Sequence, residues 1–360
     1  MTLEDLGYNI ELENYRKDQN LDSFEVGRVI SEHKERYVVK TTNKEYDAEI
    51  IGNLRFSAIK RSDFPAVGDW VAFSKYDENN VLIHSVFPRQ TIIERQAVGK
   101  QGEKQIIATN IDYALIVQAV ERDFNINRIE RYLTICYTSN VVPIIVLNKI
   151  DLISDTDLEK LITTVQERIN QVPVIPLSNE SQKGIERLKQ NIEKGKTYCL
   201  LGSSGVGKST LLNNLSGEQL MKTNTISIST NKGRHVTSHR ELIVLKNGGI
   251  LIDNPGMREV GIADSTGGLE ITFETILKLS TDCKFNNCTH TTEIDCAVIA
   301  SVESGEIDKS SYENYLKMER EKEHFESTVA EKRKKDKDFG KMIKNYKRTK
   351  KGISNKHNKV

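Results

Sequence analysis

The feature that most constrains the fold is the glycine-rich run at residues 202–210, Gly-Ser-Ser-Gly-Val-Gly-Lys-Ser-Thr. It follows the apolar residues 198–201, so the pattern predicts a strand that leads into a loop and then a helix. The backbone N–H groups of such a loop surround phosphate oxygens. Lys208 is expected to reach the β- and γ-phosphates and Ser209 to bind Mg²⁺. The predicted nucleotide-binding residues are Gly202, Ser203, Ser204, Gly205, Val206, Gly207, Lys208, Ser209 and Thr210.

A second motif, Asn148-Lys149-Ile150-Asp151, indicates which nucleotide binds. It follows the continuous apolar run 141–147, which is typical of a parallel strand buried on both faces. Its residues therefore lie at the carboxyl end of a strand, where open α/β sheets bind ligands. The Asp151 carboxylate can accept hydrogen bonds from guanine N1–H and N2–H2, and adenine offers no such pair. An unpaired buried acceptor costs about 1–3 kcal/mol, so the motif favours GTP over ATP. An ATPase would require Asp151 to be incidental.

Three further segments are candidates for contacts with GTP. Asp253-Asn254-Pro255-Gly256 follows the strand-like residues 249–252; Asp253 is expected to hold Mg²⁺ through water and Gly256 to present its N–H to the γ-phosphate. An ordinary Asn-Pro-Gly turn is the alternative. In the polar segment 233–240, Thr237 is the candidate Mg²⁺ ligand, with Thr230 and Ser238 as alternatives. Ser178 ends the short strand-like segment 172–178 and is placed to support the guanine ring by a backbone contact.

The guanine-reading motif precedes the phosphate loop, which reverses the usual order in GTPases. In a parallel sheet the strands that carry them can still be neighbours, so the order predicts a circular permutation that preserves the site. Whatever follows Gly256 is then tied directly to the segment that senses the γ-phosphate.

The cysteines predict a structural metal site. Cys283, Cys288, His290 and Cys296 supply three thiolates and one imidazole within fourteen residues, which can fill a tetrahedral shell around one Zn²⁺. Cys136 and Cys199 lie in apolar runs and are expected in the core. Because the cysteine count is five and the first residues are acidic with no apolar run, we expect neither a signal peptide nor a disulfide framework.

The first hundred residues predict a small β-barrel. Five strand-like runs are separated by Gly, Asn, Asp or Pro, at residues 24–30, 35–40, 46–51, 69–73 and 81–86. An OB-type barrel suits this count, and such barrels commonly bind single-stranded nucleic acid. The aromatic residues that can stack on bases, or instead fill the barrel core as the alternation favours, are Tyr37, Phe56, Trp70 and Phe73.

The charge is divided unevenly along the chain. Residues 331–360 carry 13 Lys and Arg against 3 Asp and Glu, a net charge of +10, and the other 330 residues carry −9. This tail lacks periodic apolar residues, which predicts disorder in isolation. It is either a solubilising tail or, as we favour, a segment that binds a polyanion. The sequence contains no run of 18 apolar residues, so it predicts no membrane span.

The predicted architecture has several domains. From Ile111 onward, strand-like runs alternate with apolar residues at helical spacing, which is typical of an α/β domain. Residues 311–325 have a helix-forming composition and begin with Ser311, which predicts a further helix. The expected divisions are an N-terminal extension at 1–22, an OB-type barrel at 23–94, a polar linker at 95–107, a circularly permuted α/β P-loop GTPase domain at 108–266, a small zinc-binding helical domain at 267–330 and a basic tail at 331–360.

Taken together, these motifs resemble the circularly permuted, ribosome-small-subunit-dependent GTPases known as RsgA or YjeQ, over residues 23–325. The resemblance rests on Asn110-Ile111-Asp112, the motif ending at Asp151, the phosphate loop, Gly233-Arg234-His235, residues 253–256 and the Cys–Cys–His–Cys set. It departs from the family at Val236, where a threonine is usual, and at Asn179, where an alanine is usual.

The resemblance implies a monomeric cytoplasmic GTP hydrolase that acts in late maturation of the small ribosomal subunit and contacts its rRNA. Met257 follows Gly256 where many GTPases have a water-orienting glutamine, and a thioether cannot orient water. We therefore expect slow intrinsic hydrolysis that the subunit stimulates, with Lys208 neutralising the γ-phosphoryl group and His235 orienting the water. His235 can instead be an RNA contact or a packing residue. An RNA-binding scaffold with a degenerate nucleotide site is the alternative function.

Overall fold

The computed structural model describes residues 1–33, 36–58, 61–96, 104–121, 124–219, 241–253 and 267–327. Within these residues, no helix is long and apolar enough to cross a membrane.

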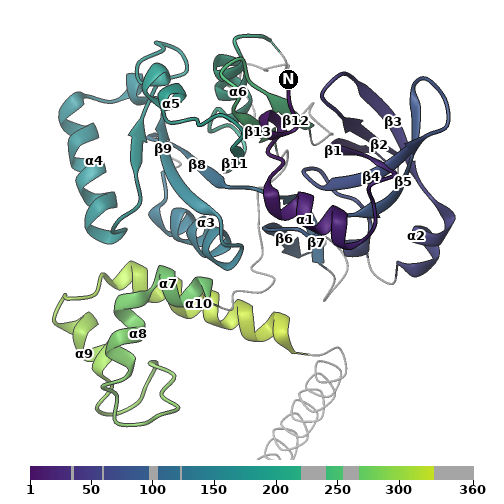
Figure 1. Cartoon of the computed structure of the whole chain (residues 1–360). Coiled ribbons are helices and arrows are strands. Elements are labelled where there is room, and N and C mark those ends of the chain that lie inside the picture. Colours follow the sequence, from purple (N-terminus) through teal and green to yellow (C-terminus); the bar gives the residue numbers. More distant parts are fainter. Residues whose placement is uncertain are drawn as a thin grey trace, which may run out of the picture.

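The N-terminal barrel is built from five strands that close on themselves (Figure 1). The first strand pairs with both the second and the fourth, and the third pairs in parallel with the fifth. Inward residues alternate with outward ones, as in β3, where every second side chain is buried. The prediction of a five-stranded OB-type barrel is confirmed. Its strands are β1 (Glu25–His33), β2 (Arg36–Lys40), β3 (Glu45–Ile50), β4 (Trp70–Lys75) and β5 (Asn80–Val86), with α2 (Gly52–Ser57) and η2 (Arg61–Asp63) between β3 and β4.

Three of the four barrel aromatics belong to the core. Tyr37 and Phe73 fill the barrel interior, and Trp70 is buried beneath the N-terminal segment. That segment contains η1 (Glu4–Leu6) and α1 (Ile10–Asp18), whose apolar residues pack against the barrel. Phe56 on α2 differs from the other three, because 94% of it is exposed.

The segment expected as a polar linker, 95–107, is ordered at both ends. β6 (Ile92–Gln96) and β7 (Lys104–Thr109) pair as antiparallel strands, so the linker prediction is wrong for those residues. Ile93 on β6 and the consecutive residues Ile106, Ile107 and Ala108 on β7 are buried, but the mostly polar stretch between the two strands concealed this signal in the sequence. Residues 97–103 lie outside the described part of the chain.

The central domain is a sheet with helices on both faces, as the α/β pattern predicts. Its strand order is β10-β9-β8-β11-β13-β12, parallel except for β12. One face is covered by α3 and α4, and the other by α5 and α6. The strands are β8 (Tyr113–Ala119), β9 (Val142–Asn148), β10 (Val174–Pro176), β11 (Thr197–Leu201), β12 (Glu241–Val244) and β13 (Ile250–Asp253). The helices are α3 (Ile126–Thr138), η3 (Ile150–Leu152), α4 (Asp155–Arg168), α5 (Ile185–Gln190) and α6 (Lys208–Ser216). Cys136 and Cys199 are fully buried in this core, as expected.

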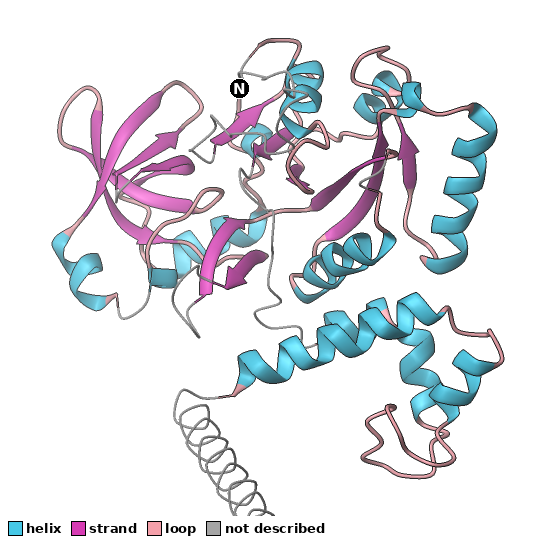
Figure 2. Ribbon diagram, turned by 180° about the vertical axis from the view of Figure 1, so that it is seen from behind, coloured by secondary structure: helices cyan, strands magenta, loops and turns pink. Residues whose placement is uncertain are grey.

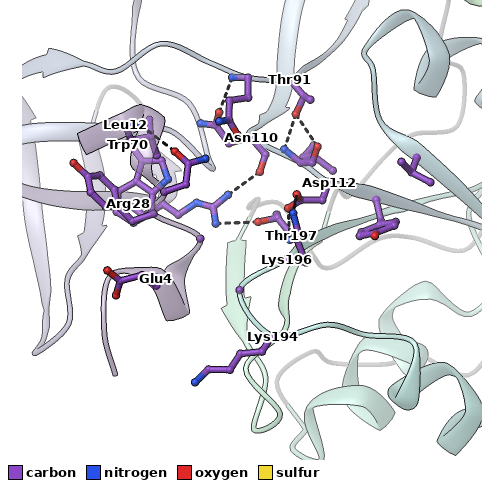
Figure 3. A pocket seen from close by; sticks show the side chains of 18 of the residues that line it. Glu4, Leu12, Arg28, Trp70, Thr91, Asn110, Asp112, Lys194, Lys196 and Thr197 are labelled. Atoms are coloured by element: carbon purple, nitrogen blue, oxygen red, sulfur yellow. Dashed lines mark hydrogen bonds and ion pairs between the residues drawn. The ribbon is translucent and has the colours of Figure 1, made fainter. Parts of the chain in front are cut away.

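The barrel and the central domain share one continuous sheet. Ser31 of β1 pairs antiparallel with Glu241 of β12, which extends the central sheet into the barrel. The N-terminal segment, the barrel and the central domain together line a cavity of about 450 Å³, which includes Arg28 (Figure 3).

Arg28 ties four segments together at this junction. Its guanidinium donates to the carbonyls of Leu6 (2.6 Å), Gly68 (3.1 Å) and Asn110 (2.9 Å) and to the Thr197 hydroxyl (2.9 Å). Burial lowers the pKa of Arg28 to about 10, so the group stays charged at neutral pH. The bonds therefore connect the N-terminal segment, the barrel and the strand that leads to the phosphate loop.

Four helices form the C-terminal unit, which lies against α3 of the central domain (Figures 1 and 2). They are α7 (Gly268–Thr272), α8 (Glu274–Ser280), α9 (Ala297–Glu303) and α10 (Lys309–Glu326). Gly268 packs so closely that a Cβ atom there would lie 2.3 Å from the Thr134 carbonyl oxygen. The last helix begins before the expected Ser311, because Asp308 caps it by accepting a hydrogen bond from the Ser311 backbone N–H.

Candidate functional site

The two motifs on which the nucleotide prediction rests lie at the ends of two parallel strands of the central sheet. The guanine-reading motif begins at the last residue of β9, and the phosphate loop begins directly after β11. Only β8 lies between these strands, and all three run in the same direction. Both motifs therefore emerge at the same edge of the sheet, where parallel α/β folds bind their ligands.

The phosphate loop has the strand–loop–helix form expected from its sequence. Gly207 has a φ of +97° and caps the N-terminus of α6, which begins at Lys208. The Lys208 Nζ donates to the carbonyl oxygens of Gly202 and Ser203, at 2.7 Å each. These bonds hold the ammonium group against the loop, and the helix N-terminus adds its own favourable field for anions.

Asn148 joins the two motifs directly. Its Nδ2 donates to the carbonyl oxygen of Val206 at 2.7 Å, and its Oδ1 accepts from the Lys149 backbone N–H at 2.8 Å. The Asn148 side chain is fully buried, so each of these polar atoms needs a partner. The structure thus brings together the motif predicted to read guanine and the loop predicted to bind phosphate, although the sequence gives them in the reverse of the usual order.

Asp151 is held by the serine that the sequence placed near guanine. The Ser178 hydroxyl donates to Asp151 Oδ1 and accepts from the Ser181 backbone N–H at 3.0 Å. Lys149 adopts a left-handed backbone conformation, with φ +67°, and its Nζ pairs with Glu121 at 2.8 Å. The sequence predicted only a backbone contact for Ser178. The hydrogen bond from its hydroxyl to Asp151 is visible only in the structure.

Two contacts of the phosphate loop were missed by sequence reasoning. Asn179 Nδ2 donates to the Gly207 carbonyl oxygen at 2.9 Å, and Arg128 Nη1 on α3 donates to the Ser203 hydroxyl at 3.1 Å. The only sequence signal for Asn179 was its departure from the alanine usual in the family. Arg128 gave no signal, because its distance from Ser203 along the chain hides their proximity.

The candidate Mg²⁺ ligands are only partly within the described residues. Asp253 is the buried last residue of β13, which pairs in parallel with β11 beside the phosphate loop. Ser209 lies in the first turn of α6. Their oxygen atoms are the ligand type that Mg²⁺ prefers. Thr230, His235, Thr237, Ser238, Gly256 and Met257 lie outside the described residues.

The four predicted zinc ligands converge in the C-terminal unit. Their ligand atoms all lie within 4.8 Å of one another. Cys283 Sγ lies 3.8 Å from Cys296 Sγ and 3.6 Å from His290 Nδ1, and His290 Nδ1 lies 3.4 Å from Cys296 Sγ. A tetrahedron with Zn–S of about 2.3 Å and Zn–N of about 2.0 Å has edges of roughly 3.5–3.8 Å. The distances among Cys283, His290 and Cys296 are close to these edges, and Cys288 Sγ lies within 4.8 Å of each, so the four residues are consistent with a Zn²⁺ ion held entirely by protein.

The local electrostatics suit metal binding by these side chains. Burial opposes ionisation of Cys283, but hydrogen bonds from the Val298 and Ala297 backbone N–H groups and from the Cys296 and Cys288 side chains together lower the pKa of the thiol. Burial raises the pKa of Cys288 to about 11 and lowers the pKa of His290, which keeps the imidazole neutral. Since zinc binds thiolates and neutral imidazole, a metal ion must displace the Cys288 proton.

A buried polar network attaches the C-terminal unit to the central domain. The carboxylate of Glu130 on α3 accepts from Arg168 Nε at 2.7 Å, from the Ser311 hydroxyl at 3.0 Å and from Asn314 Nδ2 at 2.6 Å. Glu130 is only 2% exposed, and all its partners are hydrogen-bond donors. Arg131 on the same helix forms a bidentate pair with Glu321 of α10. Helix α3 therefore touches both the phosphate loop and the zinc-binding unit.

Two family models match the chain. The model described as RsgA GTPase matches residues 86–263, and one described as ABC transporter matches residues 185–352. Both matches include the phosphate loop, but the motif at 148–151 lies only in the first. The Asp151 motif and the relatives below therefore favour the GTPase family over an ATPase family.

Curated and solved proteins agree on this family. The chain is 44% identical over 296 residues to a "Small ribosomal subunit biogenesis GTPase RsgA 2" of Lactiplantibacillus plantarum, covering 82% of this chain and 83% of that protein. It is 38% identical to a protein of Bacteroides thetaiotaomicron named "Small ribosomal subunit biogenesis GTPase RsgA 1", covering 90% of each. The crystal structure of YjeQ from Thermotoga maritima matches with a TM-score of 0.60 at 26% identity, covering 82% of this chain and 98% of that one.

Proposed function

The chain belongs to the RsgA GTPase family, and on this premise we infer how it hydrolyses GTP in ribosome biogenesis. We propose that it binds the small ribosomal subunit late in its maturation and that hydrolysis of GTP to GDP times its release. The nucleotide part of this proposal is carried by the hydrogen bond from Asn148 Nδ2 to the Val206 carbonyl, which supports a single nucleotide site formed by both motifs. The ribosomal part is supported by the relatives named as small ribosomal subunit biogenesis GTPases.

The proposed site assigns a role to each motif. Asn148, Lys149, Ile150, Asp151 and Ser178 bind the guanine base, and residues 202–210 together with Gly256 bind the phosphates. Ser209, Thr237 and Asp253 hold the Mg²⁺ that accompanies GTP. Lys208, the loop N–H groups and Mg²⁺ stabilise the charge on the γ-phosphoryl group during transfer. His235 is the proposed water-orienting residue, since Met257 cannot take that role.

The proposed partner is the small subunit and its rRNA, bound by a monomer in the cytoplasm. The barrel at 23–94 and the zinc-binding unit at 267–330 flank the GTPase domain at 108–266 and are proposed to contact RNA. Cys283, Cys288, His290 and Cys296 hold one structural Zn²⁺ that maintains the shape of this unit. The basic tail at 331–360, with its net charge of +10, adds contacts with phosphates.

The test is GTP hydrolysis by the full chain with and without purified small subunits, at two salt concentrations. We expect slow turnover alone and faster turnover with subunits, with stimulation that falls steeply as salt rises. Lys208→Ala serves as the inactive control. If subunits bind but leave the rate unchanged, the protein acts as a scaffold and the timed-switch proposal is wrong.

The role of His235 needs a separate measurement. His235→Ala should retain GTP binding and folding but lose subunit-stimulated turnover, because water orientation is required only for hydrolysis. Unchanged stimulated turnover in this variant would assign His235 to RNA contact or loop packing instead.

A further inference from the structure

We infer that Asn179 is a positioning residue that fixes the distance between the guanine-binding segment and the phosphate loop. It follows Ser178, whose hydroxyl holds Asp151, and so belongs to the loop that follows β10. The inference rests on the proposed placement of GTP across Asp151 and residues 202–210. It concerns a residue to which the sequence motifs assign no contact.

The side chain of Asn179 bridges two elements of the site. Its Nδ2 donates to the Gly207 carbonyl oxygen at 2.9 Å, next to the bond from Asn148 to Val206. Its backbone N–H lies 3.3 Å from Asn148 Oδ1. Two amides from two different strand ends therefore hold consecutive carbonyls of the phosphate loop. Without Asn179, the Gly207 carbonyl oxygen would lose its side-chain hydrogen-bond donor.

A third amide holds Asn179 itself in place. Asn214 Nδ2, on α6, donates to the carbonyl oxygen of Asn179 at 3.1 Å and to its Oδ1 at 3.2 Å. With Oδ1 accepting from α6, the Asn179 amide is oriented so that its Nδ2 points to the phosphate loop. The loop after β10, the end of the phosphate loop and the following helix are therefore linked by one chain of hydrogen bonds.

Gly207 makes this arrangement possible. A Cβ atom at this position would lie 2.3 Å from Asn148 Nδ2 and 2.8 Å from Asn179 Nδ2. Only a glycine lets both amides approach the same turn of backbone, and its φ of +97° is one that glycine adopts without strain. The glycine therefore serves the contact with the guanine-binding segment as well as the curvature of the loop.

The consequence is a chelate effect in nucleotide binding. A ligand that occupies both the guanine and the phosphate subsites gains affinity only when their separation is fixed near the length of the nucleotide. Loss of the Asn179 amide lets the two subsites move relative to each other. Ligands that fill one subsite should be insensitive to this, whereas GDP and GTP should bind more weakly.

The experiment measures the affinity of full-length wild type and Asn179→Ala for a fluorescent GDP analogue. Guanosine and pyrophosphate are then measured as competitors. We expect GDP to bind up to about tenfold more weakly to Asn179→Ala, as loss of one partly buried hydrogen bond predicts, with a faster dissociation rate. Guanosine and pyrophosphate, which each fill one subsite, should change by less than about threefold.

Two further variants separate positioning from a general loss of structure. Asn214→Ala leaves the bond to Gly207 in place and should weaken GDP less than Asn179→Ala does. Asn191→Ala removes an exposed amide that donates to the Arg187 carbonyl oxygen, away from the phosphate loop, and it should leave all three affinities unchanged. Thermal unfolding of each nucleotide-free variant checks that the fold is retained.

Two results would overturn the inference while leaving the nucleotide site intact. The first is a GDP affinity of Asn179→Ala at the wild-type level, and the second is a loss of affinity by the same factor for GDP, guanosine and pyrophosphate. A wild-type chain that does not bind GDP would instead overturn the proposed site itself, and the inference with it.

Discussion

The side-chain amide of Asn148 donates a 2.7 Å hydrogen bond to the main-chain carbonyl of Val206, 58 residues further along the chain. This bond connects the end of β9 to the phosphate loop that follows β11, across the intervening strand β8. A chain that reverses the usual order of its motifs therefore still builds one site, because neighbours in a sheet need not be neighbours in sequence.

Replacing Asn148 with alanine should weaken GDP binding by about 10- to 100-fold. The variant loses the bond to Val206 and the Oδ1 acceptor for the Lys149 N–H, and each buried hydrogen bond contributes about 1 kcal/mol. Equilibrium titration with a fluorescent GDP analogue measures the change. An affinity within twofold of wild type would show that the two motifs do not depend on this bond.

Asp151→Asn should exchange guanine for xanthine specificity. A carboxylate accepts from guanine N1–H and N2–H2, whereas an amide can accept from xanthine N1–H and donate to its O2. We expect GTP to bind at least 100-fold more weakly and XTP to bind better than GTP, as sites built on buried hydrogen bonds discriminate strongly. Competition between XTP and GTP for the variant gives the ratio. A variant that still prefers GTP would place guanine recognition elsewhere.

Removing the metal should expose three of the five cysteines to thiol reagents. Cys283, Cys288 and Cys296 form the proposed zinc site, while Cys136 and Cys199 are fully buried and burial raises the pKa of both thiols. We expect a chelator to release one zinc per chain and three reactive thiols, with the last two reacting only in denaturant. Rapid reaction of all five thiols after chelation would contradict the burial of Cys136 and Cys199.

Glu130→Ala should lower the free energy of unfolding by about 3 kcal/mol, because it breaks a buried ion pair with Arg168, whose side chain is 11% exposed. Arg168 then keeps its 3.1 Å pair with Asp308, a carboxylate that is 58% exposed. Urea denaturation measures the change. Glu186→Ala is the matched control, since its pair with Lys189 is exposed and 3.9 Å long, and it should change stability by less than about 0.5 kcal/mol. Equal effects of the two substitutions would show that the hydrogen bonds of Glu130 do not hold α10 against α3.

Arg28→Met should also destabilise the protein by about 3 kcal/mol. The substitution removes the donor for three carbonyls and the Thr197 hydroxyl, and such buried acceptors cost free energy when unpaired. Relief of the buried charge offsets part of this loss. Arg187→Met, on the exposed side of α5, is the control in the same denaturation experiment. Stability at the control level would mean that the barrel is held to the central domain without Arg28.

The features that could be predicted from the sequence are those whose chemistry is local. Glycines at fixed spacing before Lys208 define a phosphate loop, four ligands between Cys283 and Cys296 define a zinc site, and alternating apolar residues define the barrel strands. These patterns are readable because each is a short segment whose residues act together. The strands at 92–96 and 104–109 were not predicted, because neither has a clear pattern of its own and each is stabilised by pairing with the other.

The contacts between these parts became visible only in the folded chain. Arg28, Glu130 and Asn179 each bond to groups far away in the chain, and no periodicity or motif marks a residue for such contacts. Their partners are set by which strands become neighbours and how closely helices approach them. A buried polar side chain must find its hydrogen bonds wherever the packed backbone provides them, so its role follows from the fold and not from its position in the sequence.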